Sequence, residues 1–547
     1  APSHSRANHQ ASVTVLFEGY LADVAKRTSV DAAPATAVLG RYMETGLDCL
    51  TEFRGSYTAL VLDGRTNEAH LFNDRRASRP LFYREDANRA LLVGPEVGRL
   101  ASVEPALRGI DPVAVCEFLI FASGYESRTL FHSIKKMPPG SVMTIKPDSF
   151  VLRRYWEVQI NADKPPIDED ACVEEALSLF DQSMRRLPTS NKRPFLFLSG
   201  GIDSRVILGG MRNAGLSFPA VTYGTQEGDD VPIARQLAEH CGLPITIYPI
   251  STSDPHLYFA DAASRSDGRA ETIDTPTHGS LLDRLAASFD LFVQGDKSFF
   301  GTAASTPAQA LVSAGIFSLT DAVRLCDMLD PSILRVAQSE LEQTLRNMAA
   351  PGSAMDPQDL KDKVYYEQRI VNRQNAFTAA NMRQFEQARP WLDEDLVDFL
   401  FALPGNLRKE KHICAKMLEL GHPDLAAIPF ASRDSIPQAQ TYRRDIPANP
   451  GLAAYIRSQF GEGLDSRLAA LFRPDRLASL INCLLAGKSL PVIGEQWWSG
   501  LPGMWRFNVN RYRRDLVQPI SIMLRLMQLN LYLHALDNRT SRSTAML

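Results

Sequence analysis

The chain has 547 residues, more than one ordinary hydrophobic core accommodates, so two or three domains are expected. An apolar fraction of 45% and a charged fraction of 22% are typical of a soluble globular protein, and a net charge of −4 gives no indication of a nucleic-acid binder. The seven cysteines are scattered without a CxxC pair, which argues against a zinc site or a disulfide framework and favours a reducing compartment. No apolar run approaches the roughly 20 residues of a membrane span, so we expect a cytoplasmic protein.

Residues 12–156 predict a β-rich region, because short apolar stretches alternate with turn residues. The expected strands are residues 13–17, 57–62, 70–72, 90–93 and 141–145. The polar segment 161–168, which contains two prolines, is the predicted linker.

From Glu169 onward, strands and helices alternate, a pattern typical of a parallel α/β sheet. Helices are expected at residues 169–187, 205–213 and 233–240, and strands at 195–198, 220–223 and 245–250. Beyond Asp254 the pattern is mostly helical, most clearly at residues 396–403 and 520–536.

The strongest functional signal follows the expected strand 195–198, where the chain reads Ser199-Gly200-Gly201-Ile202-Asp203-Ser204 before a helix. Glycines let the backbone approach a phosphate with its amide N–H groups, and the helix start adds partial positive charge. The serine hydroxyls are further donors, and Asp203 is a candidate Mg²⁺ ligand. The order strand–SGGxDS–helix is the pyrophosphate-loop signature of enzymes that cleave ATP to AMP and pyrophosphate. An ordinary strand-to-helix turn is the alternative.

Two other strand ends support a nucleotide site. Tyr223 and Gly224 close the strand after the loop, where an adenine or ribose would lie at the carboxyl edge of a parallel sheet. Gly295 and Asp296 end the stretch 291–296, so that Asp296 is expected to join Asp203 as a metal ligand. A helix N-cap is the alternative role for Asp296. The residues expected to bind nucleotide are Leu198, Ser199, Gly200, Gly201, Asp203, Ser204, Tyr223, Gly224 and Gly295.

At these residues the chain resembles the class B asparagine synthetase family over most of its length. The front segment carries motifs similar to the family's glutamine amidotransferase domain, namely Phe53-Arg54-Gly55-Ser56-Tyr57, Asn73-Asp74-Arg75, Arg79-Pro80-Leu81-Phe82-Tyr83, Thr129-Leu130-Phe131, Pro138-Pro139-Gly140 and Tyr155-Trp156. The resemblance implies an α/β protein with an Ntn-amidotransferase-like α+β sandwich followed by a pyrophosphate-loop parallel α/β synthetase domain. It implies boundaries at 1–160 and 169–440, with a helical C-terminal extension at 441–547.

The synthetase half carries further similar residues. Glu386, with Pro390-Trp391-Leu392-Asp393, resembles a family motif whose arginine has shifted to Arg389. Lys411 lies where family members carry a lysine that neutralises pyrophosphate. The resemblance therefore implies catalytic roles for Lys411, Asp296 and Glu386.

Four departures distinguish the chain from the family pattern. Residue 1 is Ala1 and the first cysteine is Cys49, whereas the family's glutaminase uses an N-terminal cysteine. The glutamine-holding segment is replaced near Phe17-Glu18-Gly19-Tyr20, the stretch after Gly295 is shortened, and Arg433-Asp434-Ser435 lacks the family's acyl-transfer lysine. Such a pattern resembles the glutaminase-deficient branch, the β-lactam synthetases and lasso-peptide cyclases.

The expected function is therefore an AMP-forming carbon–nitrogen ligase that uses ATP and Mg²⁺ and closes a ring in antibiotic or other natural-product biosynthesis. Its expected substrate is a small-molecule or peptide carboxylate, and a precursor-processing protein is a candidate partner, with no nucleic acid and no membrane span. Tyr365, Tyr366 and Glu367 have the residue types of a base for the amine, although a helix surface is the alternative. Competing functions are an asparagine synthetase-like amidotransferase supplied with ammonia or by a partner glutaminase, a nucleotide-binding scaffold, and another adenylating reaction such as thiolation.

Overall fold

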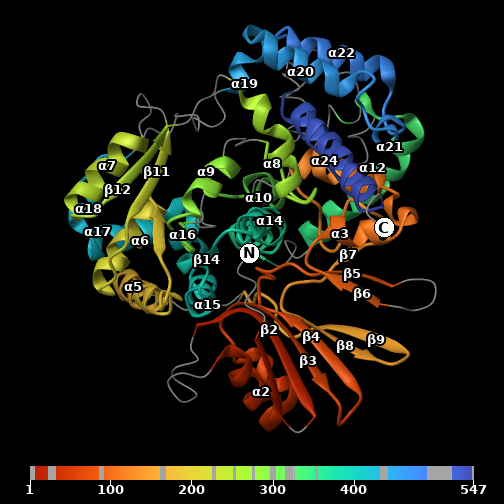
Figure 1. The fold of residues 1–547 in the computed structure, drawn as a ribbon. Helices are drawn as coiled ribbons and strands as arrows, with labels where there is room; N and C mark the ends of the chain where they lie inside the picture. The colour runs from red at the N-terminus through yellow and green to blue at the C-terminus, as the bar shows by residue number, and fades with distance from the viewer. Residues whose placement is uncertain are drawn as a thin grey trace.

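The structure is a computed structural model with two sheet-containing regions and a helical region beside them (Figure 1). It describes residues 6–10, 12–22, 33–85, 91–160, 168–224, 230–249, 254–273, 278–295, 303–314, 325, 327–350, 355–430, 442–488 and 520–544. The predicted linker 161–168 lies almost wholly outside this part of the chain, as do Ala1, Asp296 and residues 433–435.

The front region is built on a six-stranded sheet in the order β1-β2-β3-β4-β8-β9, with every neighbouring pair antiparallel. Its strands are β1 (Arg6–Gln10), β2 (Val13–Leu21), β3 (Gly55–Asp63), β4 (Glu68–Asn73), β8 (Ser141–Lys146) and β9 (Ser149–Arg154). One face packs on α2 (Pro34–Thr45) through Val15, Val38 and Phe72. Alternation of buried and exposed residues along β2 fits a sheet with one covered face.

A second, three-stranded sheet covers the other face of the large sheet over β4 and β8. Its order is β6-β5-β7, with strands β5 (Phe82–Glu85), β6 (Leu91–Gly94) and β7 (Lys135–Lys136). Leu71 and Met143 from the large sheet share a core cluster with Leu81 and Met137 beside the small one. Helices α3 (Val97–Val103) and α4 (Pro112–Phe121) lie beyond it. The sandwich of helices and two sheets confirms the predicted amidotransferase-like fold.

The second region contains a five-stranded parallel sheet in the order β12-β11-β10-β13-β14. Its strands are β10 (Pro194–Phe197), β11 (Ala220–Gly224), β12 (Ile245–Pro249), β13 (Leu291–Val293) and β14 (Glu386–Ala388). The chain moves outward on one side of β10 and then returns to its other side, so the order reverses between β10 and β13. Ligands of open α/β sheets bind at such a reversal, beyond the carboxyl ends of the strands.

Helices cover both faces of this sheet, on the left of Figure 1. Leu196 of β10 packs in one cluster with residues of α5 (Glu169–Arg185), α6 (Ile202–Asn213) and α7 (Asp230–His240). Phe195, on the opposite face, packs with Leu282 of α9 (His278–Leu285). α17 (His412–Gly421) packs against α5 and α6. The predicted parallel α/β sheet is thus confirmed.

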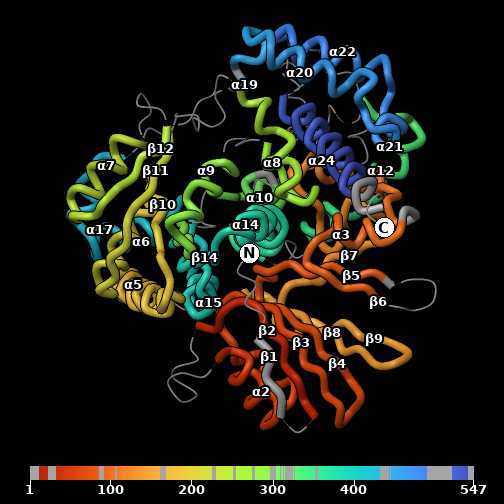
Figure 2. The backbone as a smooth tube through the Cα atoms, viewed as in Figure 1, coloured from red at the N-terminus to blue at the C-terminus, as the bar shows by residue number. Residues whose placement is uncertain are grey.

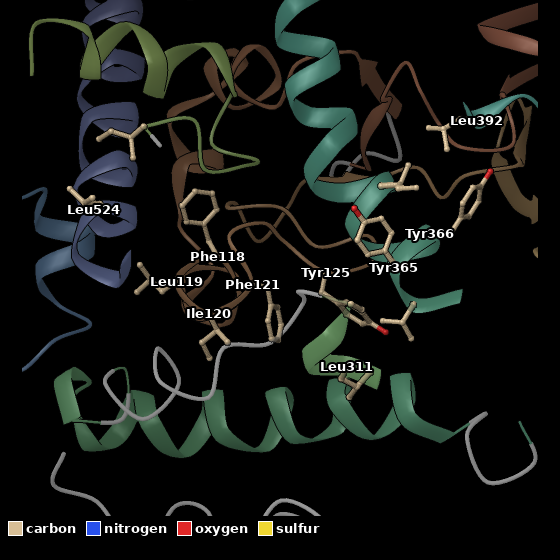
Figure 3. Packing of buried hydrophobic residues seen from close by; sticks show 14 of the residues in the cluster. Phe118, Leu119, Ile120, Phe121, Tyr125, Leu311, Tyr365, Tyr366, Leu392 and Leu524 are labelled. Atoms are coloured by element: carbon tan, nitrogen blue, oxygen red, sulfur yellow. The ribbon is translucent and has the colours of Figure 1, made fainter. Parts of the chain in front are cut away.

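The remaining helices join the two regions. They are α8 (Phe259–Arg265), α10 (Pro307–Ser313), α12 (Pro331–Ala349), α13 (Pro357–Val364), the π-helix η5 (Tyr365–Gln374), α14 (Asn375–Asn381), α15 (Glu394–Ala402), α16 (Gly405–Arg408), α18 (Pro423–Ala426), α19 (Tyr442–Asp445), α20 (Pro450–Phe460), α21 (Ser466–Ala469), α22 (Pro474–Leu485) and α24 (Ile520–Thr544). Helix α24, dark blue in Figure 2, packs against α8, α20 and the front-region helix α4. Figure 3 shows the shared core, with Phe118 and Phe121 of α4 in the same cluster as Leu524 of α24. None of the described helices is both long and apolar enough to cross a membrane.

Candidate active site

The Ser199–Ser204 loop lies at the reversal of the parallel sheet. It leaves β10 after the buried Leu198, and α6 begins at Ile202, as the motif predicts. Gly201 is the N-cap of α6 and contributes no side chain, so the first turn of the helix presents its backbone N–H groups toward the loop. The position of the loop and its backbone N–H groups make it a candidate anion-binding site at the carboxyl end of the sheet.

Hydrogen bonds within the loop fix its shape. The Ser204 hydroxyl donates to the carbonyl of Ser199 at 2.9 Å, and the Ser199 N–H donates to the Ser204 hydroxyl at 3.3 Å. The Gly201 N–H donates to the Ser199 hydroxyl at 3.3 Å. The Gly200 N–H donates to the Asp230 carboxylate at 3.2 Å, so a carboxylate oxygen already occupies one of the loop's donors.

Asp203 and Lys411 form the charged centre of the site. Asp203 is only 7% exposed, and its Oδ2 accepts a hydrogen bond from Lys411 Nζ at 2.6 Å. Its Oδ1 is buried and has no hydrogen-bond partner in the described part of the chain. The indole N–H of Trp391 donates to the backbone carbonyl of Asp203 at 3.1 Å, which fixes the loop from below. A buried carboxylate oxygen without a partner is costly, and a bound cation is one way to satisfy it.

The backbone at Lys411 is strained. Glu410 and Lys411 have φ of 53° and 62°, so two consecutive residues with side chains adopt the left-handed region just before α17. Each costs of the order of 1–3 kcal/mol, and strain of this kind gathers at functional sites. Burial lowers the pKa of Lys411, but the Asp203 carboxylate more than offsets this, so the pKa lies above its usual value and the amine stays charged.

Gly295, at the end of the neighbouring strand, lies against the loop. A Cβ on Gly295 would come within 3.3 Å of the Asp203 carbonyl carbon and of the Ser204 nitrogen, a tight contact with the loop backbone that glycine avoids. The next residue, Asp296, lies outside the described residues. No group of three potential metal-ligating side chains occurs in the described ranges, so Asp203 is the described residue that could hold Mg²⁺, through its unpaired oxygen.

Tyr223 and Gly224 end β11, at the same edge of the sheet. The Tyr223 ring packs against Phe197 at 5.1 Å and against His278 at 5.8 Å between centroids. Burial raises the pKa of Tyr223, so its phenol stays neutral. This aromatic group gives the carboxyl edge of β10 and β11 an apolar surface beside the loop, suited to a planar base.

Glu386 lies apart from this group. It is the first residue of β14, opposite Leu291 at the amino end of β13, whereas the loop lies beyond the carboxyl ends. Both oxygens of Glu386 accept hydrogen bonds at 2.6 Å from Arg79 of the front region. The structure thus brings Asp203, Lys411, the loop and Gly295 together and places Glu386 at the contact between the two regions.

Three residues considered as a base for the amine lie on η5. Tyr365 is close enough to Asp203 and Lys411 to interact electrostatically with both, while Gln374 donates to its hydroxyl at 3.2 Å. Burial raises the pKa of Tyr365, so the phenol is protonated at neutral pH and is poorly suited to accept a proton. Tyr366 is buried against Phe401, and Glu367 pairs with Lys363 at 2.9 Å.

Two residues of the site were not found from the sequence. Asp230 accepts a hydrogen bond from the Gly200 N–H of the loop. Its place as an acidic residue in the first turn of α7 is the sequence feature that could have indicated it. Arg205, fully buried in α6, donates to the backbone carbonyls of Leu425 and Ile428 at 2.8 and 2.5 Å. It therefore ties the loop's helix to the turn that follows α18, although a lone arginine in a helical pattern gives no indication of such contacts.

Comparison with known proteins agrees with these two regions. Residues 22–156 match a model of the glutamine amidotransferase domain, and residues 175–295 match a model of asparagine synthase. Asparagine synthetase [glutamine-hydrolyzing] 3 of Bacillus subtilis is 29% identical over 31% of this chain and 27% of its own length. Putative asparagine synthetase [glutamine-hydrolyzing] 2 of Methanocaldococcus jannaschii is 26% identical over 32% of this chain and 34% of its own.

The matched stretches span about a third or less of these curated relatives. A solved structure, glutamine phosphoribosylpyrophosphate amidotransferase of B. subtilis complexed with ADP and GMP, is 12% identical over 44% of this chain and 47% of its own, with a TM-score of 0.18, too low for a structural comparison. The chain thus carries a region similar to a glutamine amidotransferase domain followed by a region similar to asparagine synthase, and these curated relatives are asparagine synthetases.

Proposed function

We propose that the chain is an ATP-dependent, AMP-forming carbon–nitrogen ligase whose reaction takes place at the Ser199–Ser204 loop. The observation that carries the proposal is the Asp203–Lys411 pair, 2.6 Å apart beside the loop, with the second Asp203 oxygen buried and unsatisfied. A pair that served stability alone would have that oxygen bonded. The family similarity supports the same chemistry.

In the proposed first step, an oxygen of the substrate carboxylate attacks the α-phosphorus of ATP. The bond from that phosphorus to the bridging oxygen breaks, and pyrophosphate leaves. The loop amides and the Ser199 hydroxyl bind phosphate oxygens, while Lys411 is released from Asp203 to face the leaving pyrophosphate. Mg²⁺ bound at Asp203 would supply further positive charge for the phosphates.

In the second step an amine attacks the acyl carbon, and AMP leaves with the electrons of the acyl–oxygen bond. The acyl-adenylate is readily hydrolysed, so water must be excluded. Trp391 packs on Phe180 at 4.7 Å between ring centroids and bonds to the Asp203 carbonyl, so it places apolar surface against the loop. That packing supports a dry site on one side of the reacting atoms.

We also propose that the front domain does not hydrolyse glutamine with a cysteine of this sequence. Cys49 and Cys116 are the cysteines of the front region, and both are buried. Burial raises the pKa of the Cys49 thiol to about 12 and raises that of Cys116 as well, so neither forms a thiolate near neutral pH. At the end of β2, Arg79 covers Gly19 and pairs with Glu18 at 3.1 Å. These contacts support a front domain that binds the synthetase domain without supplying ammonia.

Without glutamine as a nitrogen source, the finer proposal is that the attacking amine belongs to the substrate itself, so that the product is a lactam. Ammonia is the second candidate, because the curated relatives are asparagine synthetases.

A product assay separates these outcomes. Purified chain is incubated with ATP, Mg²⁺ and a library of small amino acids and short peptides, with isotope-labelled ammonium or glutamine as the added nitrogen source. Ring closure lowers the substrate mass by one water and incorporates no label, whereas ammonia ligation exchanges a hydroxyl for a labelled amino group. Pyrophosphate release without either product, or release of glutamate from glutamine, would contradict the lactam or the front-domain proposal respectively.

A further inference from the structure

A cavity lies away from the Ser199–Ser204 loop, where the front domain meets α12, α13 and η5. Its volume is about 290 Å³. Tyr125, Met348, Leu360 and Val364 give it apolar walls, and Lys136 and Asn372 lie at one end. Much of the remaining lining is polar or charged, including Arg154, Lys363 and Glu367, so the cavity combines an apolar wall with polar groups. Its volume is at the lower end of the range of small-ligand sites.

Lys136 is the polar anchor of this cavity. It belongs to β7, is 7% exposed, and donates a hydrogen bond to the Asn372 carboxamide oxygen. No carboxylate lies within ion-pair distance of its ammonium among the described side chains. An ammonium has three donors, so one neutral acceptor leaves it incompletely satisfied. A smaller cavity of about 30 Å³ lies on the other side of Lys136, lined by Arg269 and Asp267.

The side chains around Lys136 do not supply a counter-charge for its ammonium group. Burial, together with the charge of Arg269, lowers the pKa of Lys136 to about 7, and Glu126 only partly offsets these two effects. The nearby Asp267 already accepts hydrogen bonds from the Val97 and Gly98 N–H groups and from the Tyr532 hydroxyl. An anion that entered the 290 Å³ cavity would supply the missing counterion.

We propose that this cavity binds a small organic carboxylate, with its carboxylate on Lys136 and Asn372 and its hydrocarbon body on Tyr125, Leu360 and Val364. Of the cations that line the cavity, Lys363 pairs with Glu367 and Arg154 with Glu157. Lys136 is the lining cation without a carboxylate partner among the described side chains, so a singly charged head with an apolar tail fits beside it. A phosphate, with nearly two charges and no tail, would leave the apolar walls uncovered. Glu126 and Glu367 also line the cavity and disfavour a more highly charged anion.

The site is separate from the ATP loop but borders the same helix. Val364 lines the cavity and immediately precedes Tyr365, the η5 residue that interacts with Asp203. In Figure 3, Tyr125 and Tyr365 lie in one packed region between α4 and η5. Binding here can be measured without ATP, so its outcome does not depend on the proposed reaction.

Isothermal titration calorimetry of the whole chain tests the proposal with isovalerate, isoamyl alcohol and inorganic phosphate as probes. We expect isovalerate to bind at least about ten-fold more tightly than the alcohol of the same carbon skeleton, because a buried charge-assisted hydrogen bond is lost with the alcohol. Lys136→Met should weaken isovalerate binding by about ten-fold or more and leave the alcohol unchanged. Lys146→Met, at an exposed lysine of β8, is the matched control and should bind as the unmodified chain does.

Asn347→Trp provides a second variant that leaves Lys136 intact. Asn347 is exposed and lines the cavity, so an indole there should block entry and weaken binding of both isovalerate and the alcohol. Melting temperatures report folding, and Lys136→Met should keep or raise the value because it removes a buried cation. Equal binding of isovalerate by Lys136→Met, tighter binding of phosphate than of isovalerate, or no isovalerate binding at all would each overturn the proposal.

Discussion

Two carboxylates of the synthetase domain, Asp203 and Glu386, have opposite surroundings, although the sequence analysis expected both in the active site, Asp203 as a metal ligand and Glu386 as a catalytic residue. Both oxygens of Glu386 are bonded to Arg79 at 2.6 Å, and its Oε1 also accepts from the Gln387 N–H at 3.2 Å. Asp203 has one oxygen on Lys411 and the other without a partner in the described chain. Both oxygens of Glu386 are therefore engaged by protein donors, whereas one oxygen of Asp203 is left to bind a ligand.

The position of each pair agrees with this difference. Glu386 belongs to a row of ion pairs that joins the front domain to the segment from β14 to α15, which also includes Arg54–Asp395 at 3.0 Å and Arg75–Asp398 at 2.8 Å. The Asp203–Lys411 pair lies beside the loop, and Lys411 has a left-handed backbone conformation. We infer that the ion pairs between the two domains hold the domains together, whereas the charged side chains beside the loop are available to bind a ligand.

The largest expected effect is that of Asp203→Asn, which should abolish ATP-dependent pyrophosphate release, with a loss of about 10³-fold or more. The amide keeps the volume and can still accept from Lys411, but it cannot offer a carboxylate to Mg²⁺. Phosphate release assays coupled to pyrophosphatase measure the rate, and circular dichroism should show an unchanged fold. Turnover within a few-fold of the unmodified chain would remove Asp203 from the reaction.

Lys411→Met comes next, with an expected loss of about 10²-fold in turnover and a smaller change in ATP affinity. Charge that develops on leaving pyrophosphate is stabilised more in the transition state than in the bound substrate. Lys411→Arg should restore only part of the rate, because a planar guanidinium does not replace a point charge. Lys416→Met, an exposed lysine of α17 paired with Glu419, is the control. Equal rates for both Met variants would reject the proposed role.

The centre of the site was accessible from sequence because it depends on local order. The strand 195–198, the glycines and Asp203 are consecutive, so the pyrophosphate loop and the start of α6 at Ile202 could be predicted together. Glu386 could not be placed in this way, because its partner Arg79 is 307 residues away in another domain. Asp230 and Arg205 were missed for the same reason, since their contacts depend on how helices pack.

The longer strands could be predicted from the sequence, whereas a fully buried helix and a short edge strand could not. Short apolar stretches predicted the first part of β2 and predicted β10 and β11 close to their bounds. Helix α4 was missed, because Val113–Phe121 are all buried and leave no polar face to reveal a helical period. β14 has only three residues, with the sequence Glu-Gln-Ala, so the edge of the parallel sheet gave no strand signal.

Glu386→Gln should have a small effect on turnover, within about two-fold, and a clear effect on stability. The free energy of unfolding should fall by about 2 kcal/mol, less than for a fully broken buried pair, because Arg79 keeps Glu18 at 3.1 Å. Urea unfolding followed by fluorescence measures the change. A loss of turnover comparable to that of Asp203→Asn, with stability unchanged, would reverse the comparison and give Glu386 a catalytic role.

The smallest expected effect is that of replacing both members of the pair at once, in Arg79→Met with Glu386→Leu. Each single change leaves a partly buried charge without its main partner, whereas the double change removes both charges and adds apolar contact. Replacing a buried ion pair by hydrophobic residues of similar volume is often neutral or stabilising. The free energy of unfolding of the double variant should therefore lie within about 1 kcal/mol of that of the unmodified chain, and the coupling energy in the double-mutant cycle should be of the order of 1–3 kcal/mol.

Pyrophosphate release by the double variant should remain intact, because Glu386 lies at the amino end of β14 and the loop lies beyond the carboxyl ends. Additive losses from the two single variants would show that Arg79 and Glu386 act separately, and that attachment of the two domains depends on the other ion pairs of the row.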